Sequence, residues 1–148
     1  MKCLSVWEPW ASLLACGHKA YETRSWLPPY EAMRVDVAIH AGQSLAGMVH
    51  LDQDQCLADV CDRKLGRAHP FEFGRIIAVG RFGFTIPTDG IVAAGVLAEE
   101  LAMGDWSPGR WAWRFLDVQH LRRSVPCRGR QKLFTLPADV AAQVQAQL

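Results

Sequence analysis

The residues of this sequence best suited to carry out chemistry are Lys19, Glu22 and Arg24, a short polar series that follows Gly17. In an extended strand, Glu22 and Arg24 share one face because successive side chains alternate. Lys19 reaches Glu22 only if it lies in the turn after Gly17, before the strand begins. Together the three would combine a carboxylate that accepts a proton with two cations that bind an anion. The alternative is an exposed ion pair on a strand edge, worth at most ~1 kcal/mol.

Tryptophans lie on both sides of this polar series. Trp7 and Trp26 could form a platform for a nucleic-acid base, where stacking contributes ~1–3 kcal/mol per base, or they could pack in the core. Trp10 falls on the apolar stripe of a helix, so we expect it in the core. Trp106 stands beside a turn and is a candidate pocket wall.

Ser107 and Arg110 flank a Pro-Gly pair that is typical of a type II turn. A tight turn exposes backbone N–H groups and a hydroxyl, which together can hold a phosphate. The alternative is that Ser107 merely starts the turn.

His40 lies opposite the valines of its expected strand. It could line a pocket as a proton-transfer group, or it could be a histidine on a polar face. Downstream, basic residues gather in one stretch, either as a solvated face or as a strip that follows the backbone of single-stranded RNA. These residues are Arg122, Arg123, Arg128, Arg130 and Lys132.

Length and composition favour one domain over residues 1–148. The chain has 148 residues, half of them apolar, and a net charge of +1. This balance argues against a protein that coats duplex nucleic acid by bulk attraction. The sequence has no apolar run of the ~20 residues that a membrane helix needs, and no signal-peptide pattern. We therefore expect a soluble, cytoplasmic protein.

The cysteines do not indicate a metal site. There are five, an odd number for a disulfide framework. Cys56, Cys61 and His69 lack the spacing of a zinc motif, and the two cysteines fit a helix with Leu57 and Val60. We expect no metal and no cofactor.

Hydrophobic periodicity and Gly and Pro punctuation predict interspersed strands and helices. The expected strands span residues 2–6, 19–26, 34–41, 74–84, 110–118 and 132–136. The strand at 34–41 alternates and should be half-buried, while the glycines at 80 and 83 predict a bend or bulge. The expected helices run from Pro9 to Gly17, over 43–65, from Asp89 through Ile91, Val92, Val96 and Leu97 to Leu101, and over 137–148. Short, bent strands favour a compact mixed barrel over a doubly wound parallel sheet.

Four segments read together resemble the ASCH family, the activating signal cointegrator homology domains of the PUA-like superfamily. They are LSVWEPWA at 4–11, GHKAYETRSW at 17–26, IHA at 39–41, and GDWSPGRWAW at 104–113 followed by PCRGRQ at 126–131. The resemblance implies an α+β fold, a small mixed β-barrel with flanking helices. It also implies a cleft for RNA or a nucleotide-like ligand, with Lys19 placed beside Glu22.

Two functions from different classes follow. The first is a binding module that holds a base or modified nucleotide of single-stranded RNA in a Trp-walled cleft. Its polar groups would come from Lys19, Arg24 and Ser107. The second is a metal-independent hydrolase on the same site, with Lys19, Glu22 and Ser107 as its catalytic residues.

The binding residues expected around either site are Trp7, Arg24, Trp26, His40, Trp106 and Arg110. For the hydrolase, RNA cleavage outranks deacetylation of acetylcytidine, because relatives with that activity carry a nucleophilic Thr where this chain has Glu22. A peptide-binding domain is a further alternative, for which the sequence offers no positive signal.

Overall fold

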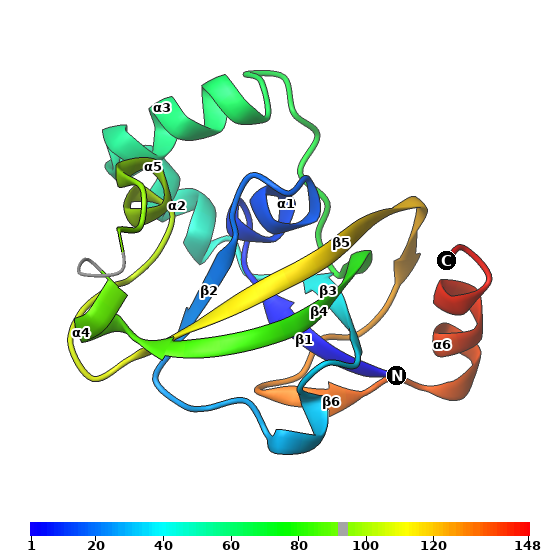
Figure 1. The fold of residues 1–148 in the computed structure, drawn as a ribbon. Coiled ribbons are helices and arrows are strands. Elements are labelled where there is room, and N and C mark those ends of the chain that lie inside the picture. Colours follow the sequence, from blue (N-terminus) through cyan, green and yellow to red (C-terminus); the bar gives the residue numbers. More distant parts are fainter. Residues whose placement is uncertain (92–94) are drawn as a thin grey trace.

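A strongly curled, mixed sheet is the main feature of the fold (Figure 1). The structure, a computed structural model, describes residues 1–91 and 95–148. Its strands are β1 (Lys2–Val6), β2 (Tyr21–Arg24), β3 (Asp36–Ala41), β4 (Arg75–Pro87), β5 (Trp111–Pro126) and β6 (Leu133–Thr135). They are ordered β2-β5-β4-β3-β1-β6. The strands β1 and β3 run parallel, and the other neighbouring strands run antiparallel.

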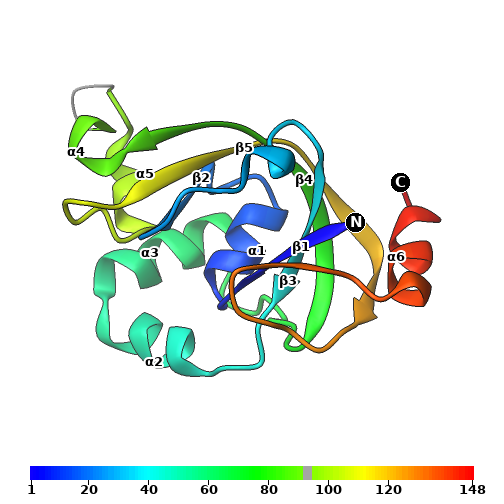
Figure 2. The ribbon, with the colours of Figure 1, turned by 90° about the horizontal axis from the view of Figure 1, so that it is seen from below.

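Helices flank the sheet on two sides. They are α1 (Trp10–Ala15), α2 (Ala46–Gln53), α3 (Gln55–Lys64), α4 (Thr88–Ile91), α5 (Ala98–Ala102) and α6 (Ala138–Gln145), with a 3₁₀ turn η1 at Tyr30–Ala32. Figures 1 and 2 show α2, α3 and α5 gathered at one end beside α1, whereas α6 lies at the other end with both termini. None of the helices within 1–91 and 95–148 has the length and apolar character to cross a membrane.

The curl of the sheet comes from its two long central strands. The pairing of β4 with β5 shifts register between Val79 and Arg81 and again between Phe82 and Thr85, at Gly80 and Gly83. A Cβ on Gly80 would lie 2.9 Å from the Phe115 ring, so glycine permits the close approach. The sheet thus bends into a half-barrel, which confirms the mixed, barrel-like α+β fold expected from the sequence.

Helix α1 lies between the sheet and the outer helices, and its burial explains its apolar sequence. Leu14 packs into the core of the half-barrel with Phe82 and Trp113. Leu13, on another face of α1, packs with Leu57 of α3 and Met103, which follows α5. A helix covered on both sides needs apolar residues around most of its circumference.

The strand at 34–41 differs from its expected half-buried pattern. Strand β3 lies in the interior of the sheet, and both of its faces are covered: Ile39 belongs to one apolar cluster and Ala38 to the other. His40 is consequently only 1% exposed, whereas Val35, which precedes the strand, is 42% exposed. The prediction from alternating polarity is wrong here because a second apolar cluster, which includes residues of β6 and α6, covers the face expected to meet solvent.

The expected helix from Asp89 to Leu101 is wrong as a single element. The structure has two short helices there, α4 and α5, and Gly95 between them has a φ of +72°. Val92 lies outside the described residues. The helix at 43–65 is likewise two helices, because Asp54 ends α2 and its side chain accepts a hydrogen bond from Leu57 N as the cap of α3.

Candidate functional site

A cavity of about 260 Å³ opens where β2 and the end of β1 face the segment after α5. Several residues singled out in the sequence line it: Trp7, Lys19, Glu22, Arg24 and Arg110. Trp10 lines it too, and it also packs against two apolar clusters, as its position on a helix stripe predicted. This cavity therefore brings together the polar series and two of the tryptophans.

The end of α1 explains why Lys19 meets Glu22. Gly17 has a φ of +72°, a left-handed value that turns the chain after the helix. The N–H of Lys19 then donates to the Leu13 carbonyl at 3.0 Å, so Lys19 stays outside β2 and its alternation. Lys19 Nζ lies 3.7 Å from Glu22 Oε2 and also donates to the Tyr21 carbonyl.

The three charged groups are coupled and largely buried. Arg24 Nη2 lies 3.0 Å from Glu22 Oε1, as expected for neighbours on one face of a strand. Lys19 is 2% exposed, and its burial lowers the pKa of its ammonium group, while the charges of Glu22 and Glu100 act in the opposite direction. Two cations thus flank one carboxylate in the cavity wall, and the Glu100 carboxylate lies close behind them.

Glu100, which the sequence analysis missed, fixes the start of β2. Its carboxylate accepts hydrogen bonds from the N–H groups of Ala20 and Tyr21 at 2.9–3.1 Å. The side chain reaches across from α5, some eighty positions along the chain. No local pattern signals such a contact, because Glu100 resembles any acidic residue in the first turn of a helix.

Buried donors without a partner occur in and beside this cavity. Among the described residues, Trp10 Nε1 and Arg24 Nε belong to lining residues and have no hydrogen bond. Trp106 Nε1 is likewise buried without a partner, but Trp106 is not among the lining residues of either cavity. A Cβ placed on Gly104, which lines the cavity, would lie 3.0 Å from Trp106 Nε1 and 3.5 Å from Lys19 Nζ. Buried N–H groups are normally satisfied, so this cluster suits a ligand rich in acceptor oxygens or nitrogens.

A second, larger cavity of about 700 Å³ adjoins the first. The two share Ser5, Trp7 and Arg24, which therefore lie where the cavities meet. Trp26 and His40, both singled out in the sequence, line the second cavity with the loop from Arg128 to Lys132. We call these two cavities together the cleft.

Of the turn at residues 107–110, only Arg110 lines the cleft. Gly109 has a φ of +80°, as a type II turn requires. Arg110 lines the first cavity and donates to the carbonyls of Asp105 and Thr23, which ties the turn to β2. Ser107 is exposed and its hydroxyl donates to Asp105 Oδ1 at 2.7 Å. The lining residues of the two cavities do not include Ser107.

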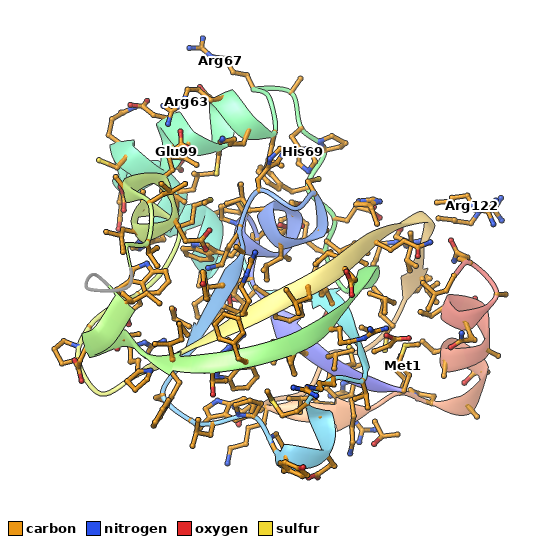
Figure 3. The ribbon with its side chains drawn as sticks, in the orientation of Figure 1. Met1, Arg63, Arg67, His69, Glu99 and Arg122 are labelled. Atoms are coloured by element: carbon orange, nitrogen blue, oxygen red, sulfur yellow. The ribbon has the colours of Figure 1, made fainter. Side chains whose placement is uncertain are left out.

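The basic stretch expected to act together is divided. Arg128, Arg130 and Lys132 line the second cavity. Arg123 instead lies beside the end of α6, where its backbone exchanges hydrogen bonds with the Gln147 side chain. Figure 3 shows Arg122 projecting away from the molecule in that same region.

Comparison with solved structures defines the class of the fold. The ASCH protein of Zymomonas mobilis matches 98% of this chain and 93% of its own length, with a TM-score of 0.60 and 15% identity. Two single-substitution variants of that protein match equally well, with TM-scores of 0.60 at 15% and 14% identity; 98% of this chain aligns with 94% and 96% of theirs. At such identities the likeness concerns the fold alone.

The sequence itself places the chain in a family. A profile of the ASCH domain matches residues 4–93, and the chain belongs to the ASCH domain family. This confirms the resemblance, and the match covers the first three of its four segments. The family is PUA-like and is generally associated with RNA binding. No curated protein matches the sequence.

Proposed function

We propose that the cleft binds single-stranded RNA or a nucleotide. The observation that carries this proposal is that Trp7 and Arg24 belong to both cavities. Groups able to read a base and cations able to hold phosphates thus lie in adjoining cavities. Single-stranded RNA is commonly recognised in this way, by stacking, by hydrogen bonds to base edges and by cationic contacts.

The first cavity supplies the groups for a base. Lys19 and the unpaired N–H of Trp10 donate, whereas the Glu22 carboxylate accepts. A nucleobase edge offers both acceptors and donors, so it complements this mixture. Trp7 is 50% exposed, which leaves its ring available for stacking.

The second cavity supplies the groups for phosphates. Arg128, Arg130 and Lys132 are exposed, and no carboxylate of a described residue lies within 4.0 Å of them. Trp26 forms a further wall, held edge-to-face against Trp113 at 4.5 Å. Three phosphate contacts to a single strand predict a slope of log K against log salt of about −2.

Tryptophan fluorescence titration with short single-stranded RNAs and with mononucleotides tests the proposal. The variant Arg128→Gln with Arg130→Gln should weaken RNA binding about 10-fold and reduce the salt slope by about 1.4. The matched control is Arg122→Gln with Arg123→Gln, which removes the same charge outside the cleft. Equal effects of the two pairs, or no response to RNA at high micromolar concentration, would overturn the proposal.

Metal-independent RNA cleavage is the second candidate, and the buried Lys19–Glu22 pair favours it. A lysine whose pKa is lowered by burial, paired with a carboxylate inside a cavity, is typical of catalytic sites. Glu22 would take the proton of a ribose 2′-hydroxyl, whose oxygen attacks the adjacent phosphorus. The bond to the 5′-oxygen then breaks, and that oxygen leaves with the proton from Glu22. Lys19 and Arg24 would stabilise the charge on the phosphate. A role for Ser107 in positioning the nucleotide stays a prediction.

Incubation of labelled RNA with the purified chain in EDTA tests this second candidate. Cleavage by the native chain should fall at least ~100-fold in Glu22→Gln, which keeps the shape of the side chain but cannot take a proton. Equal cleavage by both proteins would mean that a contaminant is responsible.

A further inference from the structure

Ser5 and His40 form a pair that the binding proposal does not use. They are direct partners on the parallel strands β1 and β3, so their side chains project to the same side of the sheet. Ser5 Oγ lies 3.1 Å from His40 Nδ1. Ser5 lines both cavities, and His40 lines the second.

The other ring nitrogen of His40 defines the direction of this hydrogen bond. His40 Nε2 lies 2.9 Å from the carbonyl oxygen of Cys127, which can only accept, so Nε2 carries the hydrogen. Burial lowers the pKa of His40, against a smaller opposing effect of the Cys127 hydrogen bond, so the ring is neutral at pH 7. Nδ1 of a neutral ring with a protonated Nε2 is an acceptor, and the Ser5 hydroxyl donates to it.

A hydroxyl bonded to a base that is itself oriented by a third group is the arrangement of an activated nucleophile. The third group here is the Cys127 carbonyl. The loop that follows holds the pair tightly, because a Cβ on Gly129 would lie 2.5 Å from His40 Cε1 and 2.9 Å from Ser5 Oγ. Only glycine allows the loop to approach so closely.

Cationic side chains lie near Ser5, one hydrogen-bonded to its backbone carbonyl and two in the lining of the same cavity. Arg24 Nη2 donates to the Ser5 carbonyl at 2.8 Å, and its buried Nε has no partner among the described residues. That N–H is a candidate donor to an oxygen that becomes negative during reaction. Arg128 and Arg130, which line the same cavity, favour a substrate with an anionic group.

We propose that Ser5 is a nucleophile, with His40 as its general base, for the hydrolysis of acyl esters that bear an anionic group. Ser5 Oγ attacks the carbonyl carbon and passes its proton to His40 Nδ1. The bond from that carbon to the alcohol oxygen then breaks, and the alcohol leaves with the proton. Water, deprotonated by His40, next attacks the acyl-serine; the bond to Oγ breaks, Ser5 regains the proton and the carboxylic acid is released.

Covalent labelling of the full chain with a fluorophosphonate, followed by peptide mass spectrometry, tests the nucleophile. The expected result is one adduct, on Ser5, whose rate of formation falls at least ~100-fold in His40→Gln. Ser44 is the internal control, since it lines the same cavity and is more exposed but has no histidine partner. No adduct on Ser5, equal labelling of Ser44, or an undiminished rate in a folded His40→Gln variant would overturn the proposal.

Ester hydrolysis tests the substrate class. The native chain should hydrolyse the p-nitrophenyl monoester of succinate about 10-fold faster than p-nitrophenyl acetate. Arg128→Gln with Arg130→Gln should remove this preference, and Ser5→Ala should remove the activity towards both esters. A full rate in Ser5→Ala would refute the mechanism without bearing on RNA binding, which is measured separately by titration.

Discussion

Arg24 connects two strands that are not neighbours in the sheet, through its hydrogen bond to Ser5. The guanidinium extends from β2, at one edge, and donates to the Ser5 carbonyl of β1 at 2.8 Å. The same Nη2 lies 3.0 Å from Glu22. The curl of the sheet brings these strands together, and Arg24 holds them beside the cleft.

Replacing Arg24 by Lys should therefore weaken both ligand binding in the cleft and the contact between β1 and β2. A lysine ammonium is a compact point charge without the planar fork, so it cannot make both contacts from this position. We expect unfolding to become easier by about 1–2 kcal/mol and RNA binding to weaken about 10-fold. Chemical denaturation and fluorescence titration measure the two effects. Arg114→Lys is the comparison, since Arg114 also donates to a backbone carbonyl, that of Ala20, but lies outside the cleft. An equal loss of RNA affinity in Arg114→Lys would contradict the role of Arg24 in binding.

Gly104→Ala should narrow the first cavity without unfolding the chain. The new methyl group would lie 3.0 Å from Trp106 Nε1 and 3.5 Å from Lys19 Nζ, so the indole must move by a few tenths of an ångström. We expect a loss of stability of about 1 kcal/mol and weaker binding of mononucleotides.

Calorimetry of nucleotide binding measures the effect of Gly104→Ala. The control is Gly90→Ala, whose methyl group would meet its nearest neighbour among the described residues at an ordinary 3.9 Å. Unchanged nucleotide affinity in Gly104→Ala would exclude this end of the cavity from binding.

Gly129→Ala should displace the loop that carries the cavity cations. Its methyl group would lie 2.5 Å from His40 Cε1, a distance that forces the loop or the ring to shift. We expect a loss of about 1–3 kcal/mol in stability and a reduced rate of Ser5 labelling. Thermal unfolding and the fluorophosphonate assay test this, and native values in both would show that the loop does not pack as described.

Glu8 should make stability depend on pH. It is fully buried, and burial raises its pKa to about 7 against the opposing hydrogen bonds from Ser12. The folded chain then binds more protons than the unfolded chain between the ordinary carboxyl pKa and 7. The free energy of unfolding is therefore greatest below that ordinary pKa and falls as the pH rises to 7, by up to about 3 kcal/mol.

Urea denaturation at pH 5 and pH 8 measures this dependence. Glu8→Gln should flatten the difference between the two pH values, because the amide does not titrate. Glu31→Gln, at an exposed carboxyl, should leave it unchanged. A native chain that is equally stable at pH 5 and pH 8 would contradict the raised pKa of Glu8.

The sequence supported prediction best where a local rule decides the structure. Gly17 ends α1, the Pro-Gly turn has its positive φ at Gly109, and the glycines at 80 and 83 mark the register shifts of β4. Local sequence patterns gave a wrong prediction where segments distant in the chain pack against an element. Strand β3 looks half-exposed by alternation, yet a second cluster covers its polar-looking face and buries His40.

The sequence by itself indicated the family and where most strands begin, and the family resemblance implied the contact of Lys19 with Glu22, since short-range geometry and recurring motifs carry these properties. The tertiary structure alone decided that Ser5 meets His40, that Glu100 holds β2, and that the basic stretch divides between the cleft and the end of α6. The physical reason is that these contacts join residues far apart in the chain, and their distances depend on strand order and on the curl of the sheet. Neither property is encoded in the neighbourhood of any one of those residues.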